Sequence, residues 1–449
     1  MSIAMPLRSV HVRRCGSIAW SVATAMGLWL VLGTLVAVRA TGPDDVISFH
    51  PFSQVDFRDS VWLPVLHFMD GGIPWDRPNF TGAYPEVQFY PLYVPSYWWL
   101  TAPLLLLPYR MAAVLWTGLL VGCLVWMVHR SLTLWFEDTV TRNPWLVPAV
   151  TAASLLLRPV QTSLSQGNWA LLCAAGSMLA LIGNCGLPDR RIGLERWFSP
   201  VVLGTCVAIV KPNIGLPLLL ALAITGRARE AGRALGLTAM LGLPIGLVVA
   251  QRAGGVPQAT HILLTTLRDG DGAQPGDTHY TRLDLSATIG RILDNPYHPA
   301  VVLGGIALAS VLTLGFGAIA VRRWGVLDAR AVTLLALATA VVTPNLHYAL
   351  LAALPALVAL CAATLRLLRA GRSRLAAVPA VDAGLVGLVM VSPVRGGTRA
   401  GLTPQLANMT YGVVLLLAVL LAAVWVAEGL RRAVLVPATS PGSRSPGPA

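Results

Sequence analysis

Residues 16–38, GSIAWSVATAMGLWLVLGTLVAV, decide the fold class of this chain. They carry no charged side chain and exceed the roughly 20 apolar residues with which an α-helix crosses a hydrocarbon core. Arg13 and Arg14 precede the run, and a basic start before an apolar stretch is also typical of a secretory signal. The apolar part of such a signal is shorter, and many further apolar runs follow here. We therefore expect a retained membrane anchor.

The rest of the chain continues this pattern. Of its 449 residues, 55% are hydrophobic and 12% are charged, and the mean hydropathy is +0.67. Soluble domains carry about twice that share of charged residues. The sequence predicts an all-α polytopic membrane protein with about 11–13 transmembrane helices. After the first run, the runs of membrane-spanning length begin near Met111, Trp145, Trp169, Pro200, Ile214, Leu235, Ala300, Ala331, Leu346, Ala376 and Tyr411.

The net charge of +13 comes from arginines that lie in short clusters between apolar runs, not on one face or in one tail. Such clusters mark cytoplasmic loops and argue against a nucleic-acid partner. We expect a plasma-membrane protein with a transmembrane domain at residues 16–432. Residues 1–15 and a disordered tail, residues 433–449, would lie in the cytoplasm. The loops 41–92 and 251–299 would then be extracytoplasmic.

The segment 93–108 does not fit simple alternation of spans. The arginine loops place residues 166–168 outside and His129 inside, so the helix near Met111 must start outside, where the loop 41–92 already ended. The segment is barely of membrane length and contains three prolines. Either it is a broken or re-entrant element packed within the protein, or a neighbouring span is miscounted.

The loop after the first apolar run is the most acidic part of the chain. It contains Asp44, Asp45, Asp56, Asp59 and Glu86. Its last part, residues 84–99, is rich in aromatic residues and proline, and carboxylates beside such a surface suit chemistry on a lipid-carried substrate. Phe57 would help to desolvate Asp56 and raise its basicity, as a general base requires. Alternatively, Asp56 or Asp59 caps a loop helix or pairs with Arg58.

Three polar groups lie at junctions between apolar runs. In the turn 163–168, Gln166 and Asn168 either contact the substrate or belong to an ordinary capped turn. Lys211, the only lysine, either binds a lipid-linked phosphate or extends to the headgroups. His347 suits a hydrogen bond to a phosphate or a sugar hydroxyl, although a histidine at a helix start is more often structural. In the long loop, Arg282 lies beside an aromatic residue and a carboxylate, a mixture that suits the binding of sugars or phosphates and is equally ordinary on a solvated loop.

Taken in order, several stretches resemble a known family. After the Asp56-Phe57 pair come GGIPW at 71–75, TAPLLLLP at 101–108, SQGNWALL at 165–172, VAIVKPNIGLPLLL at 207–220 and TPNLHYALLAALPAL at 343–357. Together they are similar to the integral-membrane GT-C glycosyltransferases, and more narrowly to the polyprenyl-phosphate-dependent mannosyl- and arabinofuranosyltransferases of actinobacterial envelopes in glycosyltransferase family 87. The resemblance covers roughly residues 16–367. The chain departs from the family pattern at Tyr90-Pro91-Leu92, where Tyr-Pro-Pro is expected, and at Gln166-Gly167-Asn168, where the family has Gly-Gln-x-Asn.

The resemblance implies an inverting glycosyl transfer at the outer leaflet, without a metal or with weak metal assistance, and with no resident cofactor. Asp56 would deprotonate the hydroxyl of an envelope glycolipid or glycan acceptor, while a polyprenyl-phosphate sugar donates a mannosyl or arabinofuranosyl group. The residues implied in substrate binding are Asp59, Glu86, Tyr90, Gln166, Asn168, Lys211, Arg282 and His347, of which the last three would stabilise the leaving phosphate.

Two other classes of protein remain open. A transporter or flippase of an envelope lipid or sugar also has many spans and helices interrupted by Pro and Gly. However, charged residues are nearly absent from the apolar runs and gather in two outer loops, and no internal repeat is evident. A noncatalytic envelope scaffold is the other class, but it would not account for the acidic residues of the loop. No nucleotide-binding motif occurs, which favours a lipid-linked donor over a nucleotide sugar.

Overall fold

The computed structural model describes residues 7–42, 51–87, 93–182, 197–270, 284–293, 299–342, 347–391 and 404–435. Within these ranges every regular element is a helix, which confirms the predicted all-α class. Seven of the described helices are long and apolar enough to cross a membrane, and three shorter apolar helices accompany them. The protein is therefore a polytopic membrane protein, as its hydropathy predicts.

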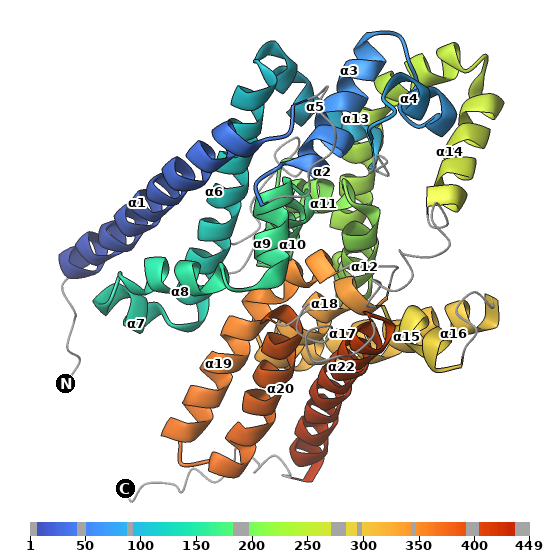
Figure 1. Cartoon of the computed structure of the whole chain (residues 1–449). Helices are drawn as coiled ribbons and strands as arrows, with labels where there is room; N and C mark the ends of the chain where they lie inside the picture. The colour runs from blue at the N-terminus through green and yellow to red at the C-terminus, as the bar shows by residue number, and fades with distance from the viewer. Residues whose placement is uncertain are drawn as a thin grey trace, which may run out of the picture.

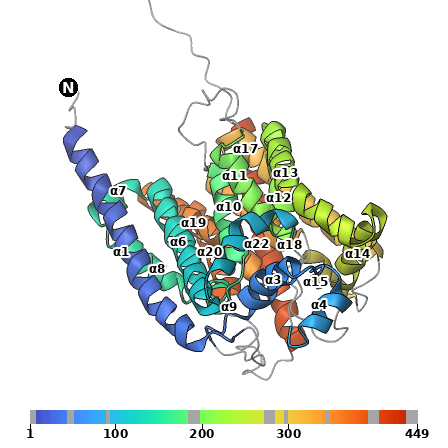
Figure 2. The same ribbon diagram turned by 90° about the horizontal axis from the view of Figure 1, so that it is seen from above.

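The long helices surround the short ones (Figure 1). The long helices are α1 (Leu7–Arg39), α6 (Tyr109–Trp135), α12 (Pro212–Leu222) with α13 (Ala228–Arg252), α16 (Pro299–Ser310) with α17 (Phe316–Trp324), α19 (Leu354–Arg369) after η8 (His347–Ala353), α20 (Ser373–Val391) and α22 (Pro404–Leu435). The short apolar helices are α10 (Ala170–Ile182), α11 (Pro200–Ile209) and α18 (Ala329–Val341). α10 and α18 are buried along almost their whole length, whereas α1 lies at the periphery beside α6 (Figure 2). The interior of the bundle is thus built in part from short apolar helices.

α1 and α6 run antiparallel, so the acidic loop begins and ends at one end of the bundle. Near that end Arg110 Nη1 donates to the carbonyl of Ala37 (3.5 Å). Near the other end the Ser21 hydroxyl and His129 Nδ1 lie 2.7 Å apart. The chain between α1 and α6 therefore makes no net crossing, which accounts for the irregular alternation of spans.

The segment 93–108 is a broken element, one of the two predicted alternatives. It consists of η2 (Pro95–Tyr97), α5 (Trp98–Thr101) and η3 (Ala102–Leu106), of which η2 and η3 are 3-10 helices. A proline lies in the first turn of η2 and of η3, where it is tolerated, but it lacks the N–H that would extend a preceding helix. Trp99 Nε1 donates to the carbonyl of Leu241 (2.6 Å), which attaches the element to α13.

The run that begins near Trp145 is not the single span that its length predicts. It forms α8 (Leu146–Ser154) and α9 (Arg158–Gln166), separated by a break at Leu157, whose backbone is extended. Pro159 in the first turn of α9 has no backbone N–H to continue a helix across this break. A short helix, α7 (Glu137–Arg142), links α6 to α8.

The chain reverses between α12 and α13, which confirms that two runs begin near Ile214 and Leu235. The reversal lies in η5 (Ala223–Arg227), where Gly226 has a φ of 88°, a conformation that glycine adopts without strain. Arg227 Nη1 donates to the carbonyl of Ala180 (3.2 Å), near the end of α10.

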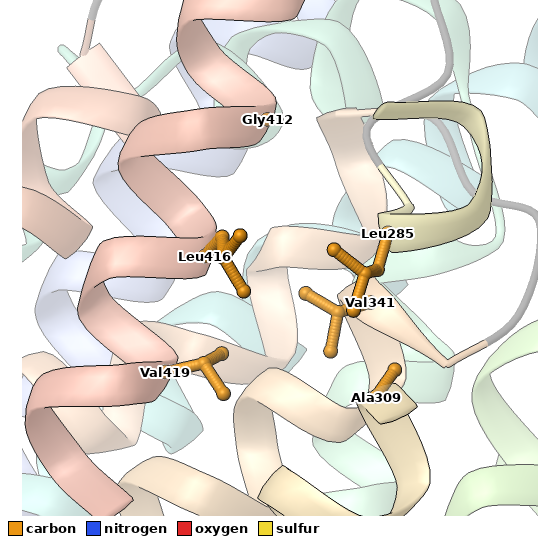
Figure 3. A pocket seen from close by; sticks show the side chains of 6 residues that line it. All are labelled: Leu285, Ala309, Val341, Gly412, Leu416 and Val419. Carbon is orange, nitrogen blue, oxygen red and sulfur yellow. The ribbon is translucent and has the colours of Figure 1, made fainter. Parts of the chain in front are cut away.

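Four helices of the C-terminal half meet around a small space. α15 (Leu285–Ile292), α16, α18 and α22 enclose a small apolar cavity (Figure 3). Its volume of about 10 Å³ is barely that of one water molecule, and its wall is lined by Leu285, Ala309, Val341, Gly412, Leu416 and Val419. It is a packing defect rather than a ligand site. η7 (Val311–Gly315) joins α16 to α17. Of the predicted disordered tail 433–449, residues 433–435 continue α22, and the others lie outside the described residues.

Candidate active site

Asp56 lies in a short helix that is fastened to the end of α9. The helix α2 (Val55–Phe57) follows Gln54, whose φ of 56° turns the chain sharply. The Gln54 backbone N–H donates to the carbonyl of Ser165 (3.1 Å), and its side-chain amide donates to the carbonyl of Leu164 (2.7 Å). Residues about 110 positions apart in the chain are thus held together.

Gly167 makes this close approach possible. Its φ is 76°, and a Cβ at this position would lie 2.5 Å from Gln54 Oε1 and 2.7 Å from Phe57 Cβ. Both the backbone conformation and the lack of space therefore require glycine. Trp116 Nε1, buried in α6, donates to the Gly167 carbonyl (2.8 Å) and fixes the turn from behind.

The side chain of Asn168 joins Asp56 to Lys211. Asn168 Nδ2 donates to Asp56 Oδ2 (2.6 Å), and Lys211 Nζ donates to Asn168 Oδ1 (3.1 Å). The same Oδ1 accepts the backbone N–H of Ala170 (2.8 Å), which fixes the orientation of the amide at the start of α10. One amide therefore holds a carboxylate on one side and an ammonium on the other.

Two tightly packed helices bring Asn168 and Lys211 together. α10 starts just after Asn168, and α11 ends just before Lys211. A Cβ at either Gly176 or Gly204 would collide with the carbonyl oxygen of the other residue, so the two backbones touch. Close approach through small residues is a common basis of helix association in membranes.

Aromatic rings enclose the ammonium group of Lys211. Its Nζ lies 3.6 Å from the centroid of the Tyr348 ring and 5.8 Å from that of Tyr93. Cation–π attraction at a desolvated site is worth about 2 kcal/mol. Lys211 keeps 5% of its surface exposed, as does Asp56, so both charges are largely desolvated. Sequence reasoning selected His347 in this stretch and overlooked the neighbouring Tyr348.

Burial shifts both ionisable groups toward their neutral forms. It raises the pKa of Asp56 from 3.8 to about 6, although the hydrogen bond from Asn168 and the charge of Lys211 act in the opposite direction. Burial also lowers the pKa of Lys211 from 10.5 to about 8, opposed by the charge of Asp56. The two groups therefore remain mostly ionised at neutral pH, with Asp56 basic enough to accept a proton.

One oxygen of the Asp56 carboxylate remains available. Oδ2 accepts the bond from Asn168, whereas Oδ1 accepts no hydrogen bond from the described residues. Asp56 lines neither the small apolar cavity beside α22 nor the polar groove at Arg252. Because only 5% of Asp56 is exposed, a substrate must displace neighbouring side chains to reach it.

Asp59 has a different role from Asp56. Its Oδ1 lies 2.7 Å from Arg58 Nε, and both side chains are 0% exposed. Arg58 also donates to the carbonyls of Glu86 (3.2 Å) and Gly42 (3.4 Å), which fastens the acidic loop. The pairing with Arg58 that the sequence left open is therefore present. This burial gives no support to the predicted contact of Asp59 with substrate.

The other predicted site residues fall into two groups. Gln166 ends α9 half-buried, with a side-chain amide that forms no hydrogen bond among the described residues, and it lies next to the Gly167 turn. Glu86 is exposed and contributes only its backbone carbonyl to Arg58. Tyr90, Arg282 and the side chain of His347 lie outside the described residues. The structure thus brings together Asp56, Asn168 and Lys211, with Gln166 adjacent in the chain.

Comparison with protein families identifies the chain. Residues 91–344 match the family model of glycosyltransferase family 87, a region that includes Asn168 and Lys211 and begins after Asp56. Comparison with curated proteins and with solved structures found no match. The match spans more than half of the 449 residues, in a chain that has the apolar helices of a multi-pass membrane protein. The protein therefore belongs to glycosyltransferase family 87 and is a membrane glycosyltransferase.

Proposed function

We propose that this enzyme transfers a mannosyl or arabinofuranosyl residue from a polyprenyl-phosphate sugar to a glycolipid or polysaccharide of the cell envelope, with Asp56 as the general base. The observation that carries the proposal is the bridge in which Asn168 bonds to Asp56 on one side and to Lys211 on the other. It supports a site with a base for the acceptor and a cation for the leaving group a short distance apart.

The proposed reaction is a single displacement. The acceptor hydroxyl oxygen attacks the anomeric carbon, the bond from that carbon to the phosphate oxygen breaks, and the hydroxyl proton passes to Asp56 Oδ1. The polyprenyl phosphate leaves with an additional negative charge, which Lys211 stabilises. General-base assistance is worth about 10²–10⁴ in rate, and a preorganised charge at the leaving group contributes a comparable factor.

The charges of the site favour this division of roles. A carboxylate whose pKa is raised to about 6 is a competent base near neutral pH. An ammonium held between tyrosine rings is desolvated, so its attraction for a phosphate is stronger than in water. Lys211 thus acts on the donor phosphate and Asp56 on the acceptor.

The active site belongs on the extracytoplasmic face of the plasma membrane in this proposal. Arg227 bonds to the carbonyl of Ala180, and Arg322 Nη2 bonds to that of Ile224 (3.0 Å). Ala180 lies at the end of α10 far from Asn168, and Ile224 lies beyond the end of α12 far from Lys211. Arginine clusters at that end support its placement in the cytoplasm by the positive-inside rule.

The donor and its partners follow from the same chemistry. A lipid-linked sugar is anchored by its prenyl chain in the membrane, so the enzyme would use it as a co-substrate and would need no resident cofactor. The acceptor would be an envelope glycolipid or glycan. A transporter of such lipids is the second candidate, and the family match favours the transferase.

The test uses purified full-length protein in detergent with radiolabelled polyprenyl-phosphate mannose or polyprenyl-phosphate arabinose and a lipoglycan acceptor. We expect labelled product, with transfer reduced by at least about 10² in Asp56→Asn. Asp138→Asn is the control, because Asp138 is exposed on α7 and distant in the fold from Asn168. Uptake of substrate into proteoliposomes without a covalent product would instead favour the transporter.

A further inference from the structure

A polar groove lies between the loop that joins α3 (Leu63–Met69) to α4 (Arg77–Ala83) and the turn that joins α13 to α14 (Val256–Gly270). Figure 1 shows α4 and α14 close together at the upper right. The groove has a volume of about 320 Å³, within the range of about 300–1,000 Å³ that is typical of small-molecule sites. Its side chains include Ile73, Asp76, Asn79, Arg252, Gln258 and Ile262. None of them belongs to the Asp56 site.

Arg252 is held rigidly at the wall of this groove. Its Nη1 donates to the carbonyls of Phe68 (2.6 Å) and Gly72 (3.0 Å), and its guanidinium lies 4.3 Å from the centroid of the Phe68 ring. Nε and Nη2 form no hydrogen bond with the described residues. Two donors are thus fixed in place at little further entropic cost to a ligand that binds them.

The remaining polar groups complement Arg252. Asn79 Oδ1 lies 2.7 Å from His67 Nε2, which leaves the Asn79 NH₂ group as a donor. Asp76 caps α4 and supplies a carboxylate, and the exposed Gln258 amide forms no hydrogen bond among the described residues. Because one cation and one carboxylate line the same groove, the set suits a neutral ligand with many hydroxyl groups better than a phosphate.

A layer of aromatic rings connects the groove to the Asp56 site. Phe68, under Arg252, contacts Trp98 edge to face at 4.3 Å, and Trp75 stacks on Trp98 at 5.4 Å. Trp75 Nε1 donates to the carbonyl of Tyr93 (3.3 Å), whose ring faces Lys211. A continuous series of aromatic contacts therefore links the groove to the proposed leaving-group cation.

We propose that this groove binds the sugar acceptor, as a neutral polyhydroxylated glycan. The inference rests on the proposed function, since it assigns the second substrate of that reaction. The Asp76 carboxylate of the groove disfavours the donor phosphate, and the polar wall disfavours a prenyl chain. Hydroxyl groups of a sugar chain would bond to Arg252, Asn79 and Gln258, while Ile73 and Ile262 contact the apolar faces of its rings.

Two glutamines provide a matched comparison. Gln258 lines the groove, whereas Gln251, the last residue but one of α13, is also exposed and does not line it. With donor saturating, we expect Gln258→Ala combined with Asn79→Ala to raise the KM for a neutral glycan acceptor about tenfold. We expect kcat and the affinity for the polyprenyl-phosphate donor to stay within about twofold, and Gln251→Ala to change none of these quantities.

The outcomes separate this inference from the proposed function. An unchanged acceptor KM in the double variant, with normal transfer by the wild type, would overturn the groove assignment and leave the transferase intact. If the wild type transfers no sugar, the groove assignment is tested by direct binding of a neutral manno- or arabino-oligosaccharide, which saturation-transfer NMR detects. Binding weakened by Gln258→Ala and not by Gln251→Ala supports the groove, and equal or absent binding refutes it. Stronger competition by glycerol phosphate than by the neutral glycan also refutes it.

Discussion

Replacing Asp56 with asparagine should make the protein inactive and more stable at the same time. Burial raises the Asp56 pKa from 3.8 to about 6, so the fold favours the neutral carboxyl. The associated stability is fully present below about pH 4 and is lost as the pH rises through 6. A rise of roughly two pH units corresponds to about 3 kcal/mol at 1.36 kcal/mol per unit, and only 5% of the residue is exposed to screening. Asparagine is neutral at every pH, so Asp56→Asn should remove this cost of burying the charged carboxylate.

Asp59→Asn is the matched comparison, because the two aspartates lie three residues apart and both are buried. Asp59 pairs with Arg58 at 2.7 Å, so its removal leaves a buried guanidinium without its carboxylate. Breaking such a pair costs about 3–5 kcal/mol. At pH 7.5 the two substitutions should therefore shift stability in opposite directions.

The stability of the two variants is compared by thermal unfolding of the purified proteins in the same detergent and at the same scan rate. We expect the midpoint of Asp56→Asn to exceed that of the wild type at pH 7.5 and the difference to shrink toward pH 4.5, while Asp59→Asn unfolds earlier. If Asp56→Asn were destabilised at pH 7.5 as strongly as Asp59→Asn, Asp56 would be a structural anion like its neighbour, and the argument for a poised base would fail.

Three further predictions concern the same site. The pH profile of kcat/KM should be bell-shaped, falling below about pH 6 as Asp56 is protonated and above about pH 8 as Lys211 loses its proton; a profile flat from pH 5 to 9 would contradict both assignments. Lys211→Met should lower kcat about 10²–10³-fold through loss of charge at the leaving phosphate, with folding checked by size exclusion, and activity within a few fold of the wild type would rule out that role. Gly167→Ala should reduce both stability and kcat, because its Cβ would meet Gln54 and Phe57. The control, Gly371→Ala, has a φ of 70° and open space around it, so it should lower stability by only about 1 kcal/mol and leave kcat unchanged. Equal effects of the two substitutions in initial-rate assays would show that the Gly167 turn does not position Asp56.

The sequence predicted the helical class and the α12 and α13 runs, and it selected Asp56, Asn168 and Lys211, which the structure brings together. Composition and apolar length sufficed for the class, because only helices or closed barrels satisfy the backbone in lipid. The partners of Asp56 were not predictable as partners. Asn168 and Lys211 are brought to Asp56 by the contact between Gly176 and Gly204 and by the hydrogen bonds of Gln54 to the end of α9. Neither interaction can be recognised from a local sequence pattern.

One prediction failed for a physical reason that a hydropathy plot does not record. The run from Trp145 is long enough for one span, but the break at Leu157 and Pro159 divides it. The pairing of Asp59 with Arg58 is one of the alternatives that the sequence left open, and a contact of Asp59 with substrate stays a prediction. Tyr348, the aromatic partner of Lys211, directly follows His347 in the sequence. Its contact with the ammonium depends on tertiary geometry, which residue spacing does not encode.

The Asn168 bridge has a consequence for how the enzyme matures. Its carboxylate comes from residue 56, its amide from residue 168 and its ammonium from residue 211, and the ring beneath that ammonium comes from residue 348. A nascent chain therefore inserts its opening helices long before the last contributor leaves the ribosome. Partly synthesised protein lacks the assembled centre of Asp56, Asn168 and Lys211, and C-terminal truncations that remove residue 348 should be catalytically silent even where they still insert.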